Sequence, residues 1–495
     1  MKGKKWLSLL LSGALVMGLV GCGGSGSGAS GASGEKQGED SVAQADSGSG
    51  ETEGEEEVWD RPFDKYIQDE VPEDLGGYNF KIVDFNTDIW GPEEIKSEED
   101  QLVVDIIEDV EKTFNCTIEV EDVSPDVLFE NAQPAIMGGD KYADLLGTTM
   151  WAFGYLMGGQ LVRDLSEVDS LDLSQDCFIK NLSDMATFGN ATYGFGASFG
   201  SHLTNHWVIF YNSRIWNELN LPDPYELVRN NEWTWDKLLE YAKQSLRDND
   251  GNGIVDSESD RWGMTAASGD LIRAMYLSMG GTYYAEDANG NMRLSCLDSE
   301  SAAKMKFIYD YFQNDNVLYR NENVGYLEMF AAGKSLFMAY GNGTFDELKN
   351  MEDDFGVLPM PKWNSSQESY LNPIDHNAKI YSMTTTNKNT HEAGVIIMAL
   401  ARRYQAVDEM KIQEMYDTYW RFDEDLEMVE NYVVGHGAYD VINIIKNANK
   451  NFEMPNTVLF DAAYNNTYSD ITSTIAQYEE ALNILLDEFF ANFSK

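Results

Sequence analysis

The sequence predicts an α/β protein with two lobes, each built on a mainly parallel sheet that helices flank. The chain has 495 residues. A single hydrophobic core stops growing near ~250–300 residues, so we expect more than one core. Hydrophobic residues make up 43% of the chain, and this share is enough for packed interiors. Strand-like and helix-like segments alternate, as they do where crossover helices join parallel strands.

The alternation begins at Tyr78, directly after a pair of glycines. The helix expected from Ser97 onward repeats apolar residues at helical spacing on one face. Ligands of such sheets bind beyond the carboxyl ends of the strands, so loops 86–90 and 148–153 are expected at a ligand site. The predicted strands and helices of this first part are, in chain order, residues 78–85, 97–114, 117–120, 126–137 and 143–147.

A second set of α/β elements starts near residue 207. Thr234 is expected to cap a helix, because its side-chain oxygen can accept a hydrogen bond from a free backbone N–H. The last helix is amphipathic and would bury a stripe that includes Tyr478 and Leu482. The predicted elements are strand 207–211, helix 233–246, a helix capped by Asp298 or Ser299, strand 334–339, segment 355–358, and helices 393–403 and 475–493.

The chain is strongly acidic. It carries 35 Lys and Arg against 84 Asp and Glu, which gives a formal net charge of −49. Nucleic acids bind basic surfaces that release counterions, and anionic membrane surfaces recruit Lys and Arg, so neither is an expected partner. An uncharged solute is favoured over an anion, although a local pocket can oppose the overall field.

The first residues have the features of a secretion signal. Three lysines precede an apolar run, residues 6–20, that is shorter than the ~20 residues of a membrane-spanning helix. Cys22 follows a glycine in an order that resembles the lipobox of bacterial lipoproteins, which implies a signal peptide of residues 1–21 and a lipid on the Cys22 thiol. Residues 22–60 are rich in Gly, Ser and acids, so we expect a flexible tether. A plain signal peptide with an incidental cysteine is the alternative.

The usual enzyme motifs and the Cys and His spacings of metal sites are missing from the sequence. Cys116, Cys177 and Cys296 show no metal-ligand spacing, and we expect them to be small buried hydrophobes, without a predicted disulfide. His202 and His206 are four residues apart but lack the Glu of an H-E-x-x-H site. No G-x-S-x-G elbow and no phosphate-binding loop occurs, so we expect no catalytic residues and no organic cofactor.

Four groups of sequence phrases occur in order between Tyr78 and about Leu400. They are Ala-Ile-Met-Gly-Gly-Asp with Tyr-Ala-Asp-Leu (135–145), Phe-Tyr-Asn with Leu-Pro-Asp-Pro-Tyr and Trp-Thr-Trp (210–235), Phe-Ala-Ala-Gly-Lys-Ser-Leu-Phe-Met (330–338) and Phe-Gly-Val-Leu-Pro-Met-Pro-Lys (355–362). In this order they resemble the extracellular solute-binding proteins of sugar-importing ABC transporters, in the maltodextrin-binding-like branch of the type II periplasmic-binding fold. The departures are Ala143, where the family usually has proline, and residues 404–451, which match none of its phrases.

This resemblance implies two lobes that close around a ligand in an interlobe cleft by hinge motion. By analogy, lobe 1 is 77–197 plus 376–404, and lobe 2 is 198–375 plus 405–495. The first crossover would lie in residues 194–202, whose glycines allow large backbone changes. The implied protein is a monomeric, non-catalytic lipoprotein on the outer face of a bacterial cell membrane, which captures a small solute and delivers it to the transmembrane subunits of an ABC permease.

Sugar binding, the favoured reading, makes definite physical demands. A pyranose presents apolar C–H faces, which aromatic rings can cover, and hydroxyls, which would lose free energy if they were buried without partners. Core packing is the alternative for each Trp, and Lys362 is expected as a solvated charge at the rim. From their strand-end positions, the expected ligand contacts are the aromatic residues Trp90, Trp151, Phe153, Trp207, Tyr340 and Trp363, with the polar partners Asn86, Asp88, Asn205, Ser268, Asp270 and Asn342.

One loop matches the D-x-[DN]-x-[DN]-G pattern of calcium-binding loops. The expected ligands of a structural Ca²⁺ are Asp248, Asp250, Asn252, the Ile254 carbonyl and Asp256. The twelfth position is Ser259 instead of the usual Glu, although Glu258 or Asp260 could supply the missing carboxylate. A turn of Asp, Asn and Gly without a metal is the alternative.

Two other functions stay open at this point. An extracellular glycan-acting enzyme could place two carboxylates at any of many acidic positions. A sensory receptor that feeds a membrane kinase would use the same fold and the same ligand contacts as a transport receptor.

Overall fold

The chain forms one compact unit from Trp59 onward. The predicted signal peptide, Cys22, the tether as far as residue 59, Asn205 and Asn342 lie outside the residues that the structure describes. The computed structural model describes residues 60–200, 206–313, 315–320, 324–341, 343, 348–418, 420–468 and 470–493.

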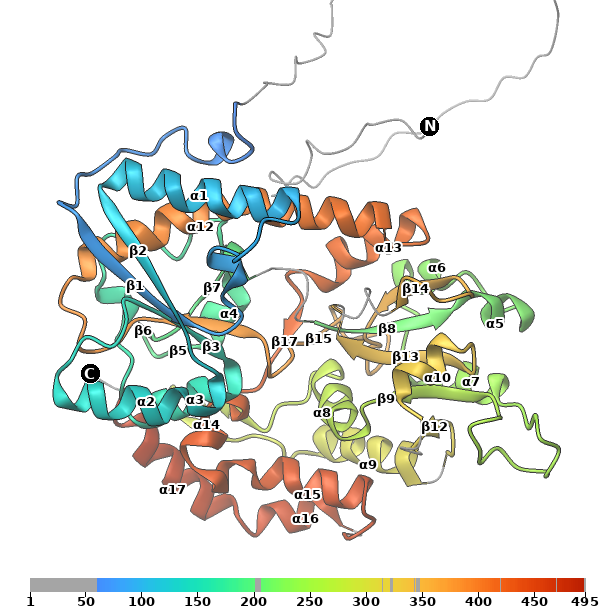
Figure 1. The fold of residues 1–495 in the computed structure, drawn as a ribbon. Helices are drawn as coiled ribbons and strands as arrows, with labels where there is room; N and C mark the ends of the chain where they lie inside the picture. The colour runs from blue at the N-terminus through green and yellow to red at the C-terminus, as the bar shows by residue number, and fades with distance from the viewer. Residues whose placement is uncertain are drawn as a thin grey trace, which may run out of the picture. The chain divides into compact units, whose positions relative to one another are not determined.

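The first sheet joins the N-terminal part of this unit to a strand from far along the chain. β1 (Tyr78–Asp84) lies at its centre and pairs in parallel with both β2 (Cys116–Asp122) and β3 (Leu145–Thr149). β16 (Lys379–Ser382) pairs antiparallel with β3, so the strand order is β16-β3-β1-β2 (Figure 1).

Helices cover this sheet for reasons that the sequence makes clear. Ser97 accepts a hydrogen bond from the backbone N–H of Asp100 at 3.0 Å, and Asp100 caps Ser97 in return, so a capping box starts α1. α1 packs along α12, as Figure 1 shows. The helices of this part are α1 (Glu98–Phe114), α2 (Pro125–Gly138), α3 (Met150–Gly158), α4 (Lys180–Met185) and α12 (Thr390–Thr418).

The second sheet is mixed, where we expected it to be mainly parallel. β8 runs antiparallel to both of its neighbours, β13 and β14. β9 pairs in parallel with β12 and β13. The strand order is β12 (Leu318–Tyr319), β9 (Trp262–Ala266), β13 (Ser335–Gly341), β8 (Trp207–Asn212) and β14 (Phe355–Pro359).

Buried tryptophans attach α7 to this sheet. Thr234 caps α7 as predicted and accepts a hydrogen bond from the N–H of Lys237 at 3.3 Å. The indole of Trp233 donates to the Pro359 carbonyl at 2.9 Å, and that of Trp235 donates to Ser278 Oγ at 2.9 Å. The helices of this part are α5 (Ser213–Glu218), α6 (Pro224–Arg229), α7 (Trp235–Ser245), α8 (Ser268–Ser278), α9 (Ser299–Gln313) and α10 (Tyr326–Ala331).

Short elements and the C-terminal helices complete the unit. The short strands are β4 (Phe178–Ile179), β5 (Thr187–Phe188), β6 (Ala191–Thr192), β7 (Gly196–Ala197), β10 (Tyr284–Glu286), β11 (Met292–Leu294), β15 (Asn372–Pro373) and β17 (Gly437–Ala438). The C-terminal helices are α13 (Asp423–Met428), α14 (Ile442–Ala448), α15 (Met454–Ala463), α16 (Ile471–Ala476) and α17 (Glu479–Phe490).

The C-terminal region differs from the sequence prediction in two ways. α12 continues to Thr418, well past the expected end at residue 403, because Tyr404, Val407 and Met415 prolong its buried face. The expected helix 475–493 is two helices, since a turn at Tyr478 separates α16 from α17. The Tyr478 side chain is 37% exposed, so it interrupts the buried stripe instead of forming part of it.

α14 and α15 pack against different halves of the structure. α14 lies along α3, which follows the first sheet, whereas α15 contacts α8 and α9 beside the second sheet. The assignment of residues 405–495 to lobe 2 stays a prediction, and the C-terminal helices contact elements beside both sheets.

The crossover glycines are explained by close packing. Gly194 and Gly196 do not adopt positive φ. A Cβ at Gly194 would lie 2.8 Å from Ile380 Cδ1, and one at Gly196 would lie 2.4 Å from Leu182 Cδ1. A side chain at either position would therefore push the crossover away from its neighbours. Glycine is required at these two positions because there is no room for a Cβ, and not because the backbone needs a positive φ.

The three cysteines of the body are free and buried, as expected. Burial raises the pKa of the Cys116 thiol to about 11 and that of Cys177 to about 12. These thiols stay protonated at neutral pH and serve as packing residues.

A buried ion pair holds β16 to the end of β1. Lys379 Nζ lies 3.0 Å from Asp84 Oδ1 and donates to the Phe85 carbonyl at 2.7 Å. The Trp90 indole and the Phe85 N–H donate to Asp84 at 2.7 and 2.8 Å. Burial raises the pKa of Asp84, and these partners oppose that shift. A Cβ at Gly147 would lie 2.4 Å from Asp84 Oδ1, so glycine is required there.

Removing one partner of this pair should strongly destabilise the protein. Lys379→Met leaves the Asp84 carboxylate buried without its counter-charge, and Asp84→Asn does the same to the ammonium; we expect each to lower the free energy of unfolding by about 3–5 kcal/mol. The double variant should cost less than the sum of the two, and urea unfolding in a double-mutant cycle measures the difference. Additive effects of the two substitutions would contradict this account.

Candidate functional site

Strand direction brings several predicted ligand residues to one edge of the second sheet. β9 and β13 end at this edge, and β8 begins there, because β8 runs antiparallel to β13. Gly341 pairs with Trp207, and the Trp207 and Tyr340 ring centroids lie 5.8 Å apart. Ser268 and Asp270 start α8 just after β9, and both are half-buried. Four of the predicted contacts therefore share this edge.

The segment that links β15 to β16 adds polar groups that sequence reasoning missed. Asp375 Oδ2 accepts a hydrogen bond from the Trp207 indole at 3.1 Å. His376 Nδ1 lies 3.8 Å from Asp375 Oδ1 and 4.0 Å from Asp270 Oδ1, with Arg273 Nη2 at 3.4 Å. Their position directly before a strand was the available signal, because crossovers of two-lobed proteins border the ligand site.

His376 is held toward its neutral form. Burial lowers its pKa, and the neighbouring Arg273 acts in the same direction, while Asp375 and Asp270 oppose the shift. A neutral imidazole has one donor and one acceptor nitrogen. It can therefore exchange hydrogen bonds with an uncharged polar ligand.

Trp151 connects the first sheet to this group. It lies in α3, just after β3, and is half-buried. Its backbone N–H donates to the His376 carbonyl at 3.3 Å, and its own carbonyl accepts from the Asn447 side chain of α14. We call Trp151, Trp207, Asp270, Tyr340, Asp375 and His376 the crossover cluster.

Two predicted ligand residues belong to the core instead, and a third, Trp207, is itself only 1% exposed. Trp90 is only 3% exposed, its ring centroid lies 4.9 Å from that of Phe199, and its indole is used by Asp84. Phe153 is fully buried. Both follow strands as predicted, but their rings point into the core. Burying an aromatic ring among apolar side chains is more favourable in free energy than leaving it exposed to solvent on a loop. The alternative of core packing is the correct one for these two.

Asn86, Asp88 and Trp363 are further described predictions that are not members of the crossover cluster. Asn86 and Asp88 are exposed on the loop after β1. Trp363 packs its ring edge against Phe307 of α9, with centroids 5.6 Å apart. Lys362 is not a solvated rim charge, since it is 1% exposed and its ammonium donates to Asn231 Oδ1 at 2.6 Å.

The predicted calcium loop gathers carboxylates, but not the full predicted set. Oxygens of Asp248, Asp250 and Asp260 all lie within 4.8 Å of one another. Asp248 accepts the N–H groups of Gly251 and Gly253, both at 2.7 Å. Asp256 instead accepts the Asn252 amide at 3.0 Å. The donor set suits a hard cation that prefers oxygen ligands, with Asp260 in the place expected for Asp256.

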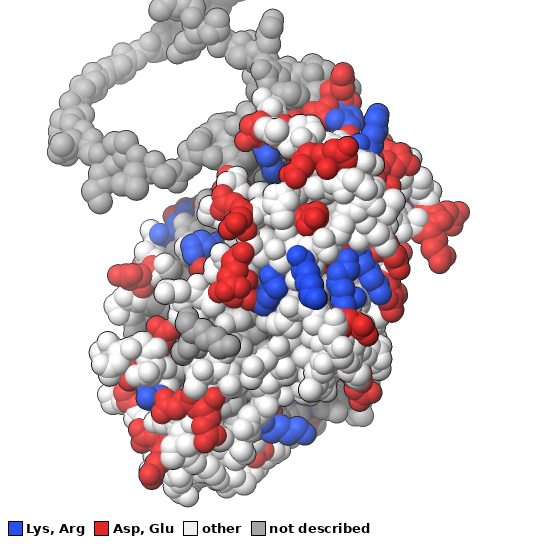
Figure 2. Space-filling model, turned by 90° about the vertical axis from the view of Figure 1, so that its left-hand side faces the viewer, with Lys and Arg blue, Asp and Glu red and all other residues white. Residues whose placement is uncertain are grey.

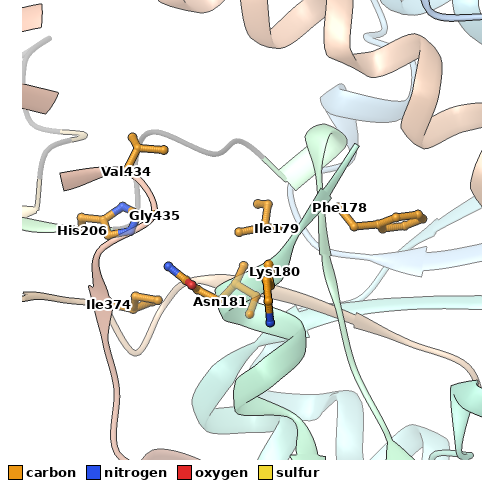
Figure 3. A pocket seen from close by; sticks show the side chains of 9 residues that line it. Phe178, Ile179, Lys180, Asn181, His206, Ile374, Val434 and Gly435 are labelled. Carbon is orange, nitrogen blue, oxygen red and sulfur yellow. The ribbon is translucent and has the colours of Figure 1, made fainter. Parts of the chain in front are cut away.

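A small apolar pocket lies where the chain passes between the sheets. Its volume is about 130 Å³, and Figure 3 shows Ile179 and Asn181 facing Ile374 and Val434 across it. Ile374 and His206 form an isolated bridge between the two connecting segments. Most of the lining is hydrocarbon, so the pocket offers a sugar few hydrogen-bonding partners. Its walls are Phe178, Ile179, Lys180, Asn181, Leu182, His206, Ile374, Val434 and Gly435.

The surface is less uniform than the net charge of −49 implies. Figure 2 shows a row of Lys and Arg side chains across the middle of one face, with acidic groups around it. Positive charges thus gather locally on an acidic protein, so the overall charge does not dictate what each site can bind. Among the described residues, no helix combines the length and the apolar character that crossing a bilayer requires.

Solved structures share this fold at low sequence identity. A cyclic α-maltosyl-1,6-maltose binding protein of Arthrobacter globiformis is 11% identical, with a TM-score of 0.58, covering 83% of this chain and 100% of that chain. UgpB of Mycobacterium tuberculosis, in complex with glycerophosphocholine, is 12% identical, with a TM-score of 0.56 and coverage of 83% and 99%. The ABC substrate-binding protein Lmo0181 of Listeria monocytogenes, with cycloalternan, is 15% identical, with a TM-score of 0.51 and coverage of 84% and 99%.

These similarities confirm the α/β, two-lobed type II periplasmic-binding fold. No curated protein matches the chain. A family model described as "Bacterial extracellular solute-binding protein" matches residues 96–401, which is more than half of the sequence. The chain therefore belongs to the bacterial extracellular solute-binding protein family.

Proposed function

We propose that this protein is the substrate-binding lipoprotein of an ABC importer and that it captures an oligosaccharide at the crossover cluster. The observation that carries the proposal is the composition of that cluster. The Tyr340 phenol and the buried Trp207 indole lie beside two carboxylates and an imidazole, and the backbone of Trp151 joins this group to the first half of the structure.

This composition suits a neutral sugar. The rings of Trp151 and Tyr340 are half-buried, so part of each ring stays accessible to cover the apolar face of a pyranose. Carboxylates accept hydrogen bonds from hydroxyl groups, and a bond to a charged group contributes about 1.5–3 kcal/mol. Asp270 is half-buried and so can serve in this way without first being freed from the core.

The mechanism is a shift of a conformational equilibrium. Trp151 follows the first sheet, Tyr340 ends a strand of the second, and His376 lies on the connection between them. A ligand that touches all three interacts best when the lobes are closed, so it favours closure by its difference in affinity for the two states. The transmembrane permease then receives the closed form, and the solute leaves chemically unchanged.

Titration of the mature protein with maltotriose and with glycerophosphocholine tests this function. We expect saturable heat of binding with maltotriose but not with glycerophosphocholine, and a smaller radius of gyration by X-ray scattering when the sugar is bound. Asp270→Asn should weaken binding about 10–100-fold, because it removes a charged acceptor. Asp236→Asn, an exposed change of the same charge on α7, should leave affinity unchanged.

The outcomes separate the alternatives. Appearance of shorter sugars during incubation would identify a glycan-acting enzyme and contradict the receptor. Equal loss of affinity in Asp270→Asn and Asp236→Asn would show that the crossover cluster is not the site.

We also propose that the loop around Asp248 binds Ca²⁺ as a structural ion. Three carboxylates lie close together there, and a cation would relieve their repulsion. We expect Ca²⁺ at a hundred-fold excess over its Kd to stabilise the protein by about 3 kcal/mol, seen as a higher Tm than in chelator. Sugar affinity should not change.

Asp248→Ala should abolish this calcium response. Asp287→Ala is the matched control, because Asp287 also accepts two backbone N–H groups in a turn, at 2.8 and 3.0 Å, but is not one of the three clustered carboxylates. A calcium response that survives Asp248→Ala would contradict the site, and lost sugar binding in folded Asp248→Ala would contradict its separation from the ligand.

The lipid anchor at Cys22 is part of the proposal and rests on the sequence order alone. Cys22→Ser should move the protein from the membrane fraction to the medium, because the thiol that receives the lipid is gone. Immunoblots of the two fractions measure this. Membrane association that persists in the variant would contradict the anchor.

A further inference from the structure

A polar cavity lies beside the second sheet, away from the crossover cluster. Its volume is about 270 Å³. It lies between the end of α8, one face of α9 and the loop after β14, and none of its lining residues belongs to the crossover cluster. The walls are Met279, Gly280, Glu300, Lys304, Trp363, Asn364, Ser366 and Gln367.

Lys304 is unusual for a residue that lines a polar cavity. Its side chain is only 7% exposed, and its ammonium lies 2.8 Å from Glu300 Oε1, whose own side chain is 66% exposed. An ammonium has three N–H donors, and Glu300 is its one ion-pair partner in the described part of the chain. Burying a charge is costly unless it is paired. Glu300 therefore stabilises the Lys304 ammonium in the wall of the cavity.

Gly280 keeps the space beside Lys304 open. It has a φ of +72°, a conformation that favours glycine, and follows the end of α8. A Cβ at this position would lie 4.0 Å from Lys304 Nζ and would begin to fill the cavity. The ammonium is therefore reachable from the cavity although it is nearly buried.

The loop that carries Trp363 is held rigidly on both sides. The Trp363 N–H donates to Gln367 Oε1 at 2.9 Å, and Gln367 Nε2 donates to the Ser278 carbonyl at 3.0 Å. The buried Lys362 ammonium donates to the Gln367 carbonyl at 2.9 Å. The indole is thus positioned before any ligand arrives, which lowers the entropy cost of binding.

The two sites are separated by the length of α8. Ser268 and Asp270 begin this helix near the crossover cluster, while Met279 and Gly280 follow its other end. Eleven residues at ~1.5 Å per residue place the two ends roughly 16 Å apart. All lining residues of the cavity belong to elements beside the second sheet, so lobe closure is not needed to assemble it.

We propose that this cavity is a second binding site, which holds one pyranose unit of a neutral saccharide. The half-buried Trp363 ring covers the apolar face of the sugar, and Lys304, Glu300 and Asn364 exchange hydrogen bonds with its hydroxyls. Glu300 neutralises Lys304, so a charged ligand gains no net attraction. The volume is below the ~300–1,000 Å³ of drug-sized ligand sites, which suits a single ring. This inference goes beyond the proposed function and does not rest on it.

Fluorine NMR of the mature protein labelled with 5-fluorotryptophan tests the site directly. The full sequence has 11 tryptophans, of which Trp6 lies in the predicted signal peptide, and the signal missing from Trp363→Phe identifies Trp363. Methyl α- and methyl β-D-glucopyranoside serve as probes. We expect one of them to shift the Trp363 signal saturably, with a midpoint of about 1–10 mM.

Two lysine variants of α9 provide the matched comparison. Lys304→Met keeps the buried chain length but removes the donors, and should raise the midpoint about 5–10-fold. Lys306→Met breaks the exposed pair with Asp310 on the same helix and should leave the midpoint unchanged. A Trp363 signal that does not move at ten times the expected midpoint, or equal effects of the two variants, would overturn the proposal.

The result is independent of the crossover cluster. The Trp363 titration should be the same in Asp270→Asn as in the wild type. The Trp363 and Trp207 signals could instead shift with one common midpoint, and Asp270→Asn could raise that midpoint. A single binding site would then explain both shifts, and the proposal of a second site would be wrong. If maltotriose does not bind at the crossover cluster, the proposed function is wrong, and the Trp363 titration still tests the second site independently.

Discussion

The buried pair of Asp84 and Lys379 fixes how the chain returns from the second sheet to the first. Asp84 ends β1, and Lys379 begins β16 three residues after His376. Because a lone charge in this position would be strongly unfavourable, the segment that carries Asp375 and His376 can enter the first sheet only in this register. The crossover cluster depends on that register, since His376 meets Trp151 and Asp270 from it.

The candidate ligand site is therefore assembled from chain segments that are distant in sequence. Trp207 and Tyr340 are neighbours because β8 is antiparallel to β13, and Asp375 reaches Trp207 because the connection runs beside both. Each side chain alone has an ordinary explanation. Together they place the half-buried Tyr340 ring beside hydrogen-bonding groups, a combination that suits an uncharged, hydroxyl-rich ligand. Close-packed glycines such as Gly147 and Gly194 let the backbone segments approach closely enough for this.

Local chemistry predicted most elements and misjudged the direction of several side chains. Ser97 and Thr234 cap their helices as expected, because a cap depends on neighbours within a few residues. Trp90 and Phe153 were expected at the ligand and lie in the core. Position after a strand is a local property, whereas the direction of a ring depends on which distant surfaces meet it. Lys362 shows the same limit, since its side-chain partner Asn231 lies 131 positions away in the sequence.

The order of hydrophobic segments, caps and family phrases was sufficient for the fold class and for the family, since these follow from short-range periodicity and from residues near one another in the chain. The pairing of Asp84 with Lys379, the meeting of His376 with Trp151, and the cavity beside Trp363 became visible only in three dimensions. Each joins residues tens to hundreds of positions apart. Such contacts are chosen by the packing of whole sheets and helices, and one sequence read along its length carries no signal for them.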